Sequence, residues 1–143
     1  MGYKFSLQNV LEWREGQEDE AKLNLIQAKN TLEQEQNYLQ KLIHENIRLK
    51  ETSMLNKRVD VMRQDDLYRK VLNEKIIQQK LIVEQSEHDV TLAERKLLKA
   101  YQDKKVMEKL REKEEEAYYA EIEANEQKIL DEFATMTFGR EAY

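Results

Sequence analysis

The residues that most often do chemistry in proteins are few in this sequence, and they are scattered. The two histidines, His44 and His88, belong to no His-x-x-His or His-Glu-x-x-His pattern, and there is no cysteine to complete a zinc site. Histidines in such polar surroundings are usually solvated surface residues rather than metal ligands. We therefore expect neither a metal site nor a cofactor.

The sequence also lacks the patterns of a catalytic or nucleotide-binding site. A phosphate-binding loop needs two glycines five positions apart that lead into Lys-Ser/Thr, whereas Gly2, Gly16 and Gly139 are isolated. Aspartate and glutamate together number 29, but carboxylates on exposed helices lack the burial that raises a pKa for acid/base work. We expect no enzymatic activity of its own.

The composition favours long helices over a globular core. Charged residues make up 37% of the 143 positions, aromatic residues make up only 8%, and proline is absent. The alternative is a disordered chain, but Leu, Ile and Val recur throughout and the charges of both signs are interspersed. A net charge of −5 disfavours nucleic acid as a partner. No apolar run is long enough for a membrane span, so we expect a soluble protein that is at most peripheral.

A coiled-coil seam is predicted for a first helix over residues 6–51. We expect Ser6 to cap this helix, with Phe5 and Val10 forming a hydrophobic staple. Apolar residues then recur with spacings of four and three, as in a coiled coil rather than a broad globular face. The seam positions are Leu7, Leu11, Arg14, Glu18, Ala21, Leu25, Ala28, Leu32, Glu35, Leu39, Leu42, Asn46 and Leu49.

The pattern fails over residues 51–66. We place a turn near residues 52–60, because Thr52, Ser53, Asn56 and Asp60 compete with helix by bonding their own backbone. A second helix is predicted over residues 61–136, capped by Asp60 or by the pair Asp65 and Asp66. Its seam positions are Leu72, Ile76, Gln79, Val83, Ser86, Val90, Ala93, Leu97, Ala100, Lys104 and Met107.

Two seams joined by a short turn predict an all-α fold: one domain, residues 1–143, in which two long helices form an antiparallel coiled-coil hairpin. A parallel homodimer of one unbroken rod is the alternative, and Asn46 could set the register in either. With a turn near residue 57, residue 7 lies opposite residue 107. We therefore expect the longer second helix to overhang, with no partner in its own chain beyond Met107.

Aromatic side chains are the candidate anchors for a partner, because aromatic residues contribute heavily to interfaces. They could instead pack along the flank of the hairpin, which the sequence favours for Trp13 and Tyr101. For Tyr118 and Tyr119, which lie beyond the hairpin, the sequence favours neither anchoring a partner nor packing along the flank. The overhang also carries a sparse apolar trace at Leu110, Tyr118, Ile122, Ile129 and Phe133.

Three segments resemble the FliJ family of the bacterial flagellar type III export apparatus. They are the opening "YKFSLQNVLEWRE", the "VDVMRQ" entry to the second helix, and the closing "MEKLREKEEEAYYAEIEANEQKILDEFA". The closing segment carries most of the resemblance, with Glu-Lys-Leu-Arg-Glu at Glu108–Glu112 and then Glu126, Gln127, Lys128, Asp131 and Glu132. Together these segments extend the resemblance over nearly the whole chain.

The resemblance implies a non-catalytic hairpin similar to the central stalk of a rotary ATPase. Such a protein would bind the hexameric flagellar export ATPase and promote its assembly and activity. It would also contact the membrane export gate protein and export chaperones, in the cytoplasm and peripherally at the inner membrane of the flagellar base. The residues expected to face the ATPase are Glu108, Leu110, Arg111, Glu112, Gln127, Lys128, Asp131 and Glu132. The residues expected to face the export gate are Leu39, Leu42, Tyr68 and Leu72.

Two other functions remain open at this point. In the first, the chain is an export chaperone or holdase, and the apolar trace of the overhang wraps an unfolded client. In the second, it is a plain homodimeric coiled-coil spacer with no catalytic partner. A holdase should suppress aggregation of a client at stoichiometric amounts, a stalk should change the hydrolysis rate of a partner enzyme, and a spacer should do neither.

Overall fold

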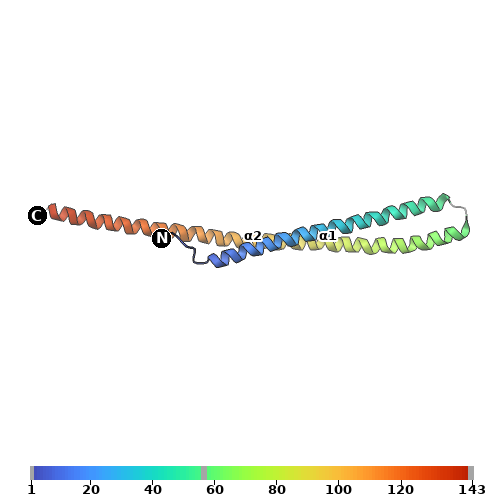
Figure 1. The fold of residues 1–143 in the computed structure, drawn as a ribbon, viewed down its shortest axis with the longest axis horizontal. Helices are drawn as coiled ribbons and strands as arrows, with labels where there is room; N and C mark the ends of the chain where they lie inside the picture. Colours follow the sequence, from blue (N-terminus) through green and yellow to red (C-terminus); the bar gives the residue numbers. More distant parts are fainter. Residues whose placement is uncertain (1, 56–57, 142–143) are drawn as a thin grey trace. The chain divides into compact units, whose positions relative to one another are not determined.

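The computed structural model describes residues 2–55 and 58–141, and these residues form two long helices. Helix α1 spans Gln8–Leu55, and helix α2 spans Val59–Glu141. The helices contain 48 and 83 residues respectively, and α1 lies alongside α2 (Figure 1). The all-α, two-helix hairpin predicted from the sequence is confirmed.

The helices extend further toward the turn than the sequence predicted. We expected a turn over residues 52–60, but α1 continues to Leu55 and α2 begins at Val59. The hydroxyl of Thr52 donates to the Arg48 carbonyl one turn earlier at 2.8 Å, and the Ser53 hydroxyl donates to the Asp65 carboxylate at 3.1 Å. Both hydroxyls therefore have partners that leave the helical backbone intact. Asn56 and Lys57, within the predicted turn, lie outside the described residues.

The predicted start of α1 is wrong in its details. The first helical bond runs from the Leu11 amide to the Leu7 carbonyl, which makes Leu7 the residue at the cap position. Ser6 uses its hydroxyl elsewhere, and no staple forms with Val10, because Phe5 packs against Leu11 instead. At the start of α2, Arg58 takes the corresponding place, and Asp60 lies within the first turn.

Contacts between Cα atoms divide the chain into two units, which are described separately. One unit comprises residues 19–99, and the other combines residues 1–18 with residues 100–143. In the first unit α1 and α2 are antiparallel, because the α2 partners have lower numbers as the α1 numbers rise. Three side-chain hydrogen bonds show this direction, pairing Glu35 with Gln79, Glu45 with Tyr68, and Ser53 with Asp65.

The buried side chains follow the predicted seams. In the unit of residues 19–99, Leu42, Leu72 and Ile76 form a core cluster, against which Leu39 and Ile43 pack. Every predicted seam position of α2 is buried or half-buried. The same holds for α1 except at Leu7, which is 42% exposed because it precedes the helix. Coiled-coil spacing is therefore what buries this narrow core.

None of the helices, over the residues that the structure describes, contains a stretch apolar enough and long enough to span a membrane.

Candidate functional site

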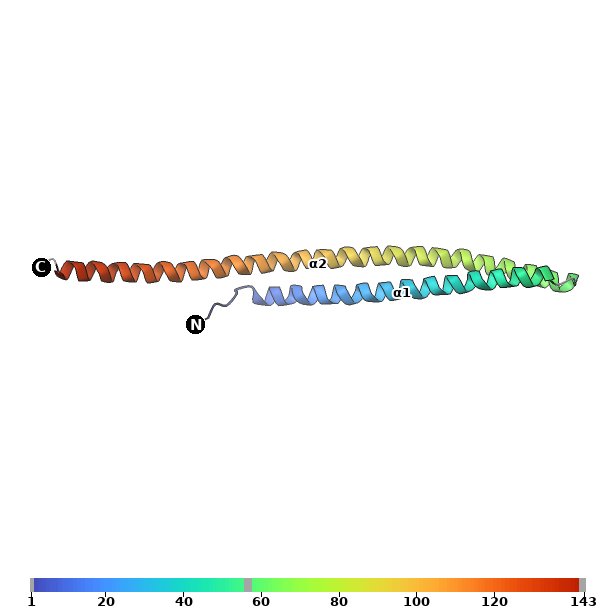
Figure 2. The same cartoon turned by 90° about the horizontal axis from the view of Figure 1, so that it is seen from above.

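The candidate functional site lies in the unit that combines both ends of the chain. There the N-terminal segment, residues 2–7, lies beside α2, and α2 continues past it (Figure 2). Phe5, Leu11 and Met107 are buried together, and Tyr3 packs against them. Leu11, rather than Leu7, is therefore at the level of Met107.

Polar contacts carry the N-terminal segment further along α2. The Ser6 backbone amide and hydroxyl both donate to the Glu114 carboxylate, at 3.2 and 2.9 Å. The Tyr3 hydroxyl donates to the Arg111 carbonyl at 3.4 Å, and the Tyr3 ring lies 5.5 Å from that of Tyr118. The prediction that α2 has no intrachain partner beyond Met107 is therefore wrong, because the N-terminal segment reaches Tyr118.

The electrostatic surroundings of Tyr3 reflect its place among glutamates. Burial beside α2 raises the pKa of the Tyr3 phenol above its ordinary value, and the Glu114 and Glu115 carboxylates raise it further. A neutral phenol can donate its proton to a carbonyl, whereas a phenolate cannot. The glutamates therefore favour the form of Tyr3 that makes the observed contact with Arg111.

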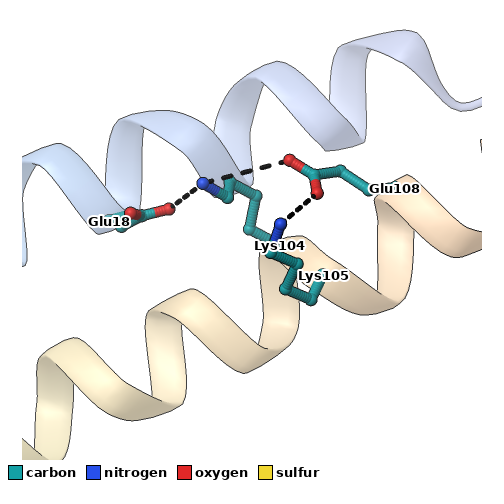
Figure 3. Close-up of polar contacts among 4 residues, drawn as sticks. All are labelled: Glu18, Lys104, Lys105 and Glu108. Carbon is teal, nitrogen blue, oxygen red and sulfur yellow. Dashed lines mark hydrogen bonds and ion pairs between the residues drawn. The ribbon is translucent and has the colours of Figure 1, made fainter.

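A polar layer of charged side chains lies next to this apolar cluster along the two helices, and Figure 3 shows it. The Lys104 ammonium lies 2.6 Å from the Glu18 carboxylate of α1 and 3.9 Å from Glu108 one turn along α2. Lys105 lies 3.0 Å from the other oxygen of Glu108. The hydrogen bond to Glu18 raises the pKa of Lys104, and the hydrogen bond to Glu108 raises the pKa of Lys105. Both lysines are thereby held in the charged form.

A second ion pair lies beside this layer. The Arg14 guanidinium is 2.9 Å from the Asp103 carboxylate. The central carbon of this guanidinium, Cζ, also lies 5.7 Å from the centre of the Trp13 ring, and Trp13 is 60% exposed. The Trp13 side chain therefore stays largely exposed beside Arg14. Tyr101 and Tyr119 are also exposed, whereas Tyr118 is half-buried against Tyr3.

Beyond Ile122, α2 has no cover from the described residues. All side chains from residue 123 to residue 139, here called the C-terminal tail, are exposed. Within it the Gln127 amide donates to the Asp131 carboxylate at 3.0 Å, an i,i+4 contact of the kind that supports an isolated helix. The predicted overhang is present as helix, and it extends to Glu141 rather than to residue 136.

One face of the C-terminal tail is apolar and uncovered. Ile129, Phe133 and Met136 are spaced by four and three residues, and they are 65%, 69% and 64% exposed. Leu130 and Phe138 are also exposed, outside this face. The spacing is that of a coiled-coil seam, so this stretch is suited to packing against a partner.

The predicted ATPase-facing residues fall into two groups along α2. The first group comprises Glu108, Leu110, Arg111 and Glu112, of which Glu108 is half-buried in its ion pairs and the others are exposed. The second group, Gln127, Lys128, Asp131 and Glu132, lies wholly within the C-terminal tail.

The predicted gate-facing residues differ in exposure. Leu42 and Leu72 are buried in the core cluster, and Leu39 packs against that cluster. Tyr68 is exposed, and its hydroxyl donates to Glu45 across the hairpin. This hydrogen bond raises the pKa of Tyr68. Tyr68 is therefore the only one of the four whose side chain is exposed, and its hydroxyl already has a partner in Glu45.

The contribution of the N-terminal segment to this site was not predicted from the sequence. Phe5 and Ser6 were given local roles at the start of the first helix, but the α2 partners of Tyr3, Phe5 and Ser6 are more than one hundred positions away. A signal was available in the second seam, because Met107, Arg111, Glu114 and Tyr118 continue its spacing of four and three. An extended segment can cover a short stretch of such a seam without being helical itself.

The described residues contain no group of three or more His, Asp or Glu side chains placed to hold a metal ion. The site consists instead of a helix surface with acidic, basic and exposed apolar side chains. Such a surface can bind another protein.

Comparison with protein families gives one match, to the model described as flagellar FliJ protein, over residues 3–142. The chain belongs to the FliJ family. The match includes both helices, the N-terminal segment and the C-terminal tail, so it confirms the resemblance stated from the sequence. No curated protein and no solved structure gave a match.

Membership in this family makes the chain a component of flagellar protein export. The FliJ family is a non-catalytic one, and the described residues of this chain form only helices and the short segments beside them.

Proposed function

We propose that this FliJ family protein is a stalk-like component that binds the hexameric flagellar export ATPase through α2 and promotes its assembly and activity. The observation that carries the proposal is the helical C-terminal tail, in which every described side chain is exposed. A helix that is polar over most of its surface gains little by standing alone. We therefore infer that this stretch packs against a binding partner.

The chemistry of the tail suits a ring with sixfold symmetry. A hairpin without that symmetry cannot satisfy six identical deep pockets at once. Exposed ion pairs contribute only about 1 kcal/mol or less each, so contacts made by Lys128, Asp131 and Glu132 can be exchanged between subunits at small cost. Glu108, Leu110, Arg111 and Glu112 form the remainder of the ATPase-facing surface in this proposal.

The turn end is proposed to contact the membrane export gate protein. Tyr68 would supply the contacting side chain, and Leu39, Leu42 and Leu72 would hold the helices in register beneath it. Binding at the gate would place the protein peripherally at the cytoplasmic face of the inner membrane. Export chaperones are the third class of partner in the proposal.

The proposal is tested by ATP hydrolysis with the cognate export ATPase. The enzyme is assayed alone, with the full chain, and with a chain that ends at Ile122. The shortened chain keeps the contacts of the N-terminal segment described above, and the described side chains that it loses, residues 123–139, are all exposed. We expect the full chain to stimulate hydrolysis and the shortened chain to stimulate it much less. Equal stimulation by both chains would show that the tail is not the activating element.

A holdase is the second candidate function, and the exposed apolar face of the tail favours it. Ile129, Phe133 and Met136 could pack against an unfolded client. The test is the light scattering of a heat-denatured client with stoichiometric amounts of the full chain. Suppression by the full chain, combined with no effect on ATP hydrolysis, would favour the holdase over the stalk.

A further inference from the structure

The N-terminal segment contacts Met107, the Arg111 carbonyl and Glu114, on the same stretch of α2 as the residues to which the proposed function assigns ATPase binding. It leaves the side chains of Leu110, Arg111 and Glu112 exposed. We propose that this segment is a displaceable cover over residues 107–118 of α2, and that its release strengthens binding of the export ATPase. The proposal rests on the proposed function and adds a regulatory element to the same site.

The position of the segment is set by three kinds of contact. Phe5 is buried against Met107 and Leu11, the Tyr3 hydroxyl bonds the Arg111 carbonyl, and Ser6 bonds Glu114 twice. The covered positions continue the seam of α2 with spacings of four and three. While the segment is in place, a helix or loop of another protein cannot pack on this stretch of the seam.

The N-terminal segment makes fewer buried contacts than the two paired helices do. Residues 2–5 have no regular secondary structure, and Phe5 is the only one of them whose side chain is buried. Its hydrogen bonds to α2 are at exposed positions, where water competes for the same groups. Segments with few buried contacts open at low free energy without unfolding the rest of a protein.

The contacts also indicate the chemistry of a competitor. It must supply an apolar side chain to replace Phe5 against Met107. It must also supply hydrogen-bond donors for Glu114, which lies in a run of three glutamates from residue 114 to residue 116. A surface that presents an apolar side chain flanked by Lys or Arg meets both needs. We therefore expect the ATPase surface that faces this stretch to be basic.

If only the open form binds, the apparent affinity is the affinity of the open form multiplied by the fraction of molecules that are open. If about one molecule in ten is open, permanent release would strengthen binding by about tenfold. Permanent closure would have the opposite effect and weaken binding. The closed state can be fixed by a cross-link between two introduced cysteines, because the chain contains no cysteine of its own.

The experiment uses the full chain with Ser6→Cys and Glu114→Cys, since both positions lie outside the buried core. The double-cysteine variant joined by a short bismaleimide linker is the locked form, and the same variant left unjoined is its reference. The released form is a separate variant, Phe5→Ala with Ser6→Ala, which removes the Phe5 contact with Met107 and the Ser6 hydroxyl bond to Glu114 and keeps the Glu114 carboxylate. A Ser6→Cys single variant reacted with a monofunctional maleimide controls for the chemical modification. Binding of each to the cognate export ATPase is measured by interferometry.

We expect the released form to bind about tenfold more tightly than the native chain, and the locked form to bind more weakly than the unjoined double-cysteine variant. Equal binding by the locked and released forms, with the native chain also binding, would overturn the displaceable cover and leave the proposed function standing. If the native chain and both forms fail to bind, the proposed function itself fails and this inference fails with it.

Discussion

Lys104 is the residue on which the polar layer depends, since it joins Glu18 of α1 to Glu108 of α2. Its pKa is raised in the folded chain, chiefly by the hydrogen bond to Glu18. A group whose pKa is higher in the folded state contributes stability that is fully present below its unfolded pKa. That stability is lost as the pH rises through the folded pKa. For Lys104 the loss begins above pH 10.5, its ordinary pKa.

We therefore expect the urea midpoint of the native chain to fall as the pH rises above 10.5, beyond the ordinary pKa of lysine. The measurement is urea unfolding followed by circular dichroism at a series of pH values. Lys104→Met is the matched control, because it keeps the aliphatic stem and removes the titrating group. A native chain with the same alkaline pH dependence as Lys104→Met would contradict this account of the layer.

Leu72 tests the core at the scale of one side chain. It is 2% exposed and lies in the cluster with Leu42 and Ile76. Leu72→Ala should lower the free energy of unfolding by roughly 2–5 kcal/mol, because it removes buried methyl groups and leaves a cavity. Leu67→Ala is the control on the same helix, where the side chain is 64% exposed, and should change stability by about 0.5 kcal/mol or less. Similar losses for the two variants would mean that the seam is not the stabilising core.

At the scale of the helix, Gly16 weakens the first part of α1 without an evident packing reason. A Cβ atom at this position would meet nothing within 4 Å. Glycine inside a helix costs about 1 kcal/mol relative to alanine, because it loses more backbone freedom on folding. Gly16→Ala should therefore stabilise α1 by up to about 1 kcal/mol and slow amide hydrogen exchange near residue 16. Unchanged exchange in this region would show that glycine does not limit the local stability.

Much of the two helices could be predicted from the sequence, because a narrow coiled-coil core imposes one simple spacing. Positions such as Gln79 and Ser86 were placed in the seam although they are polar, and the structure buries both. The Gln79 amide donates to the Glu35 backbone carbonyl at 3.0 Å, which satisfies it inside the hairpin. The spacing of four and three was therefore a better guide to burial than residue type.

The ends of the elements could not be predicted in the same way. Ser6, Thr52 and Ser53 were all given local roles, as a cap or as helix breakers, because sequence reasoning favours nearby partners. Ser6 and Ser53 instead bond carboxylates on the other helix, Glu114 and Asp65. Such partners become neighbours only after the hairpin has formed. The same reason explains why the cover over residues 107–118 was not foreseen.

At the scale of the whole molecule, the C-terminal tail should contribute to binding and little to stability. Its side chains are exposed in the described residues, so their removal takes no buried contact from the hairpin. The chain that ends at Ile122 should unfold within a few degrees of the full chain when melting is followed by circular dichroism. A large fall in its melting temperature would mean that the tail stabilises the hairpin, which would weaken its assignment to a partner.

The most direct test of the central claim compares the two surfaces assigned to different partners. Lys128→Glu with Asp131→Lys reverses exposed charges in the C-terminal tail, and Tyr68→Ala alters the turn end. Binding of both variants to the cognate export ATPase is measured beside the native chain at low salt, where exposed charges are least screened. We expect the tail variant to lose up to about thirtyfold in affinity, because two exposed ion pairs together contribute about 2 kcal/mol at most. The Tyr68 variant should bind as the native chain does. Intact binding by the tail variant, together with loss of binding by Tyr68→Ala, would contradict the account.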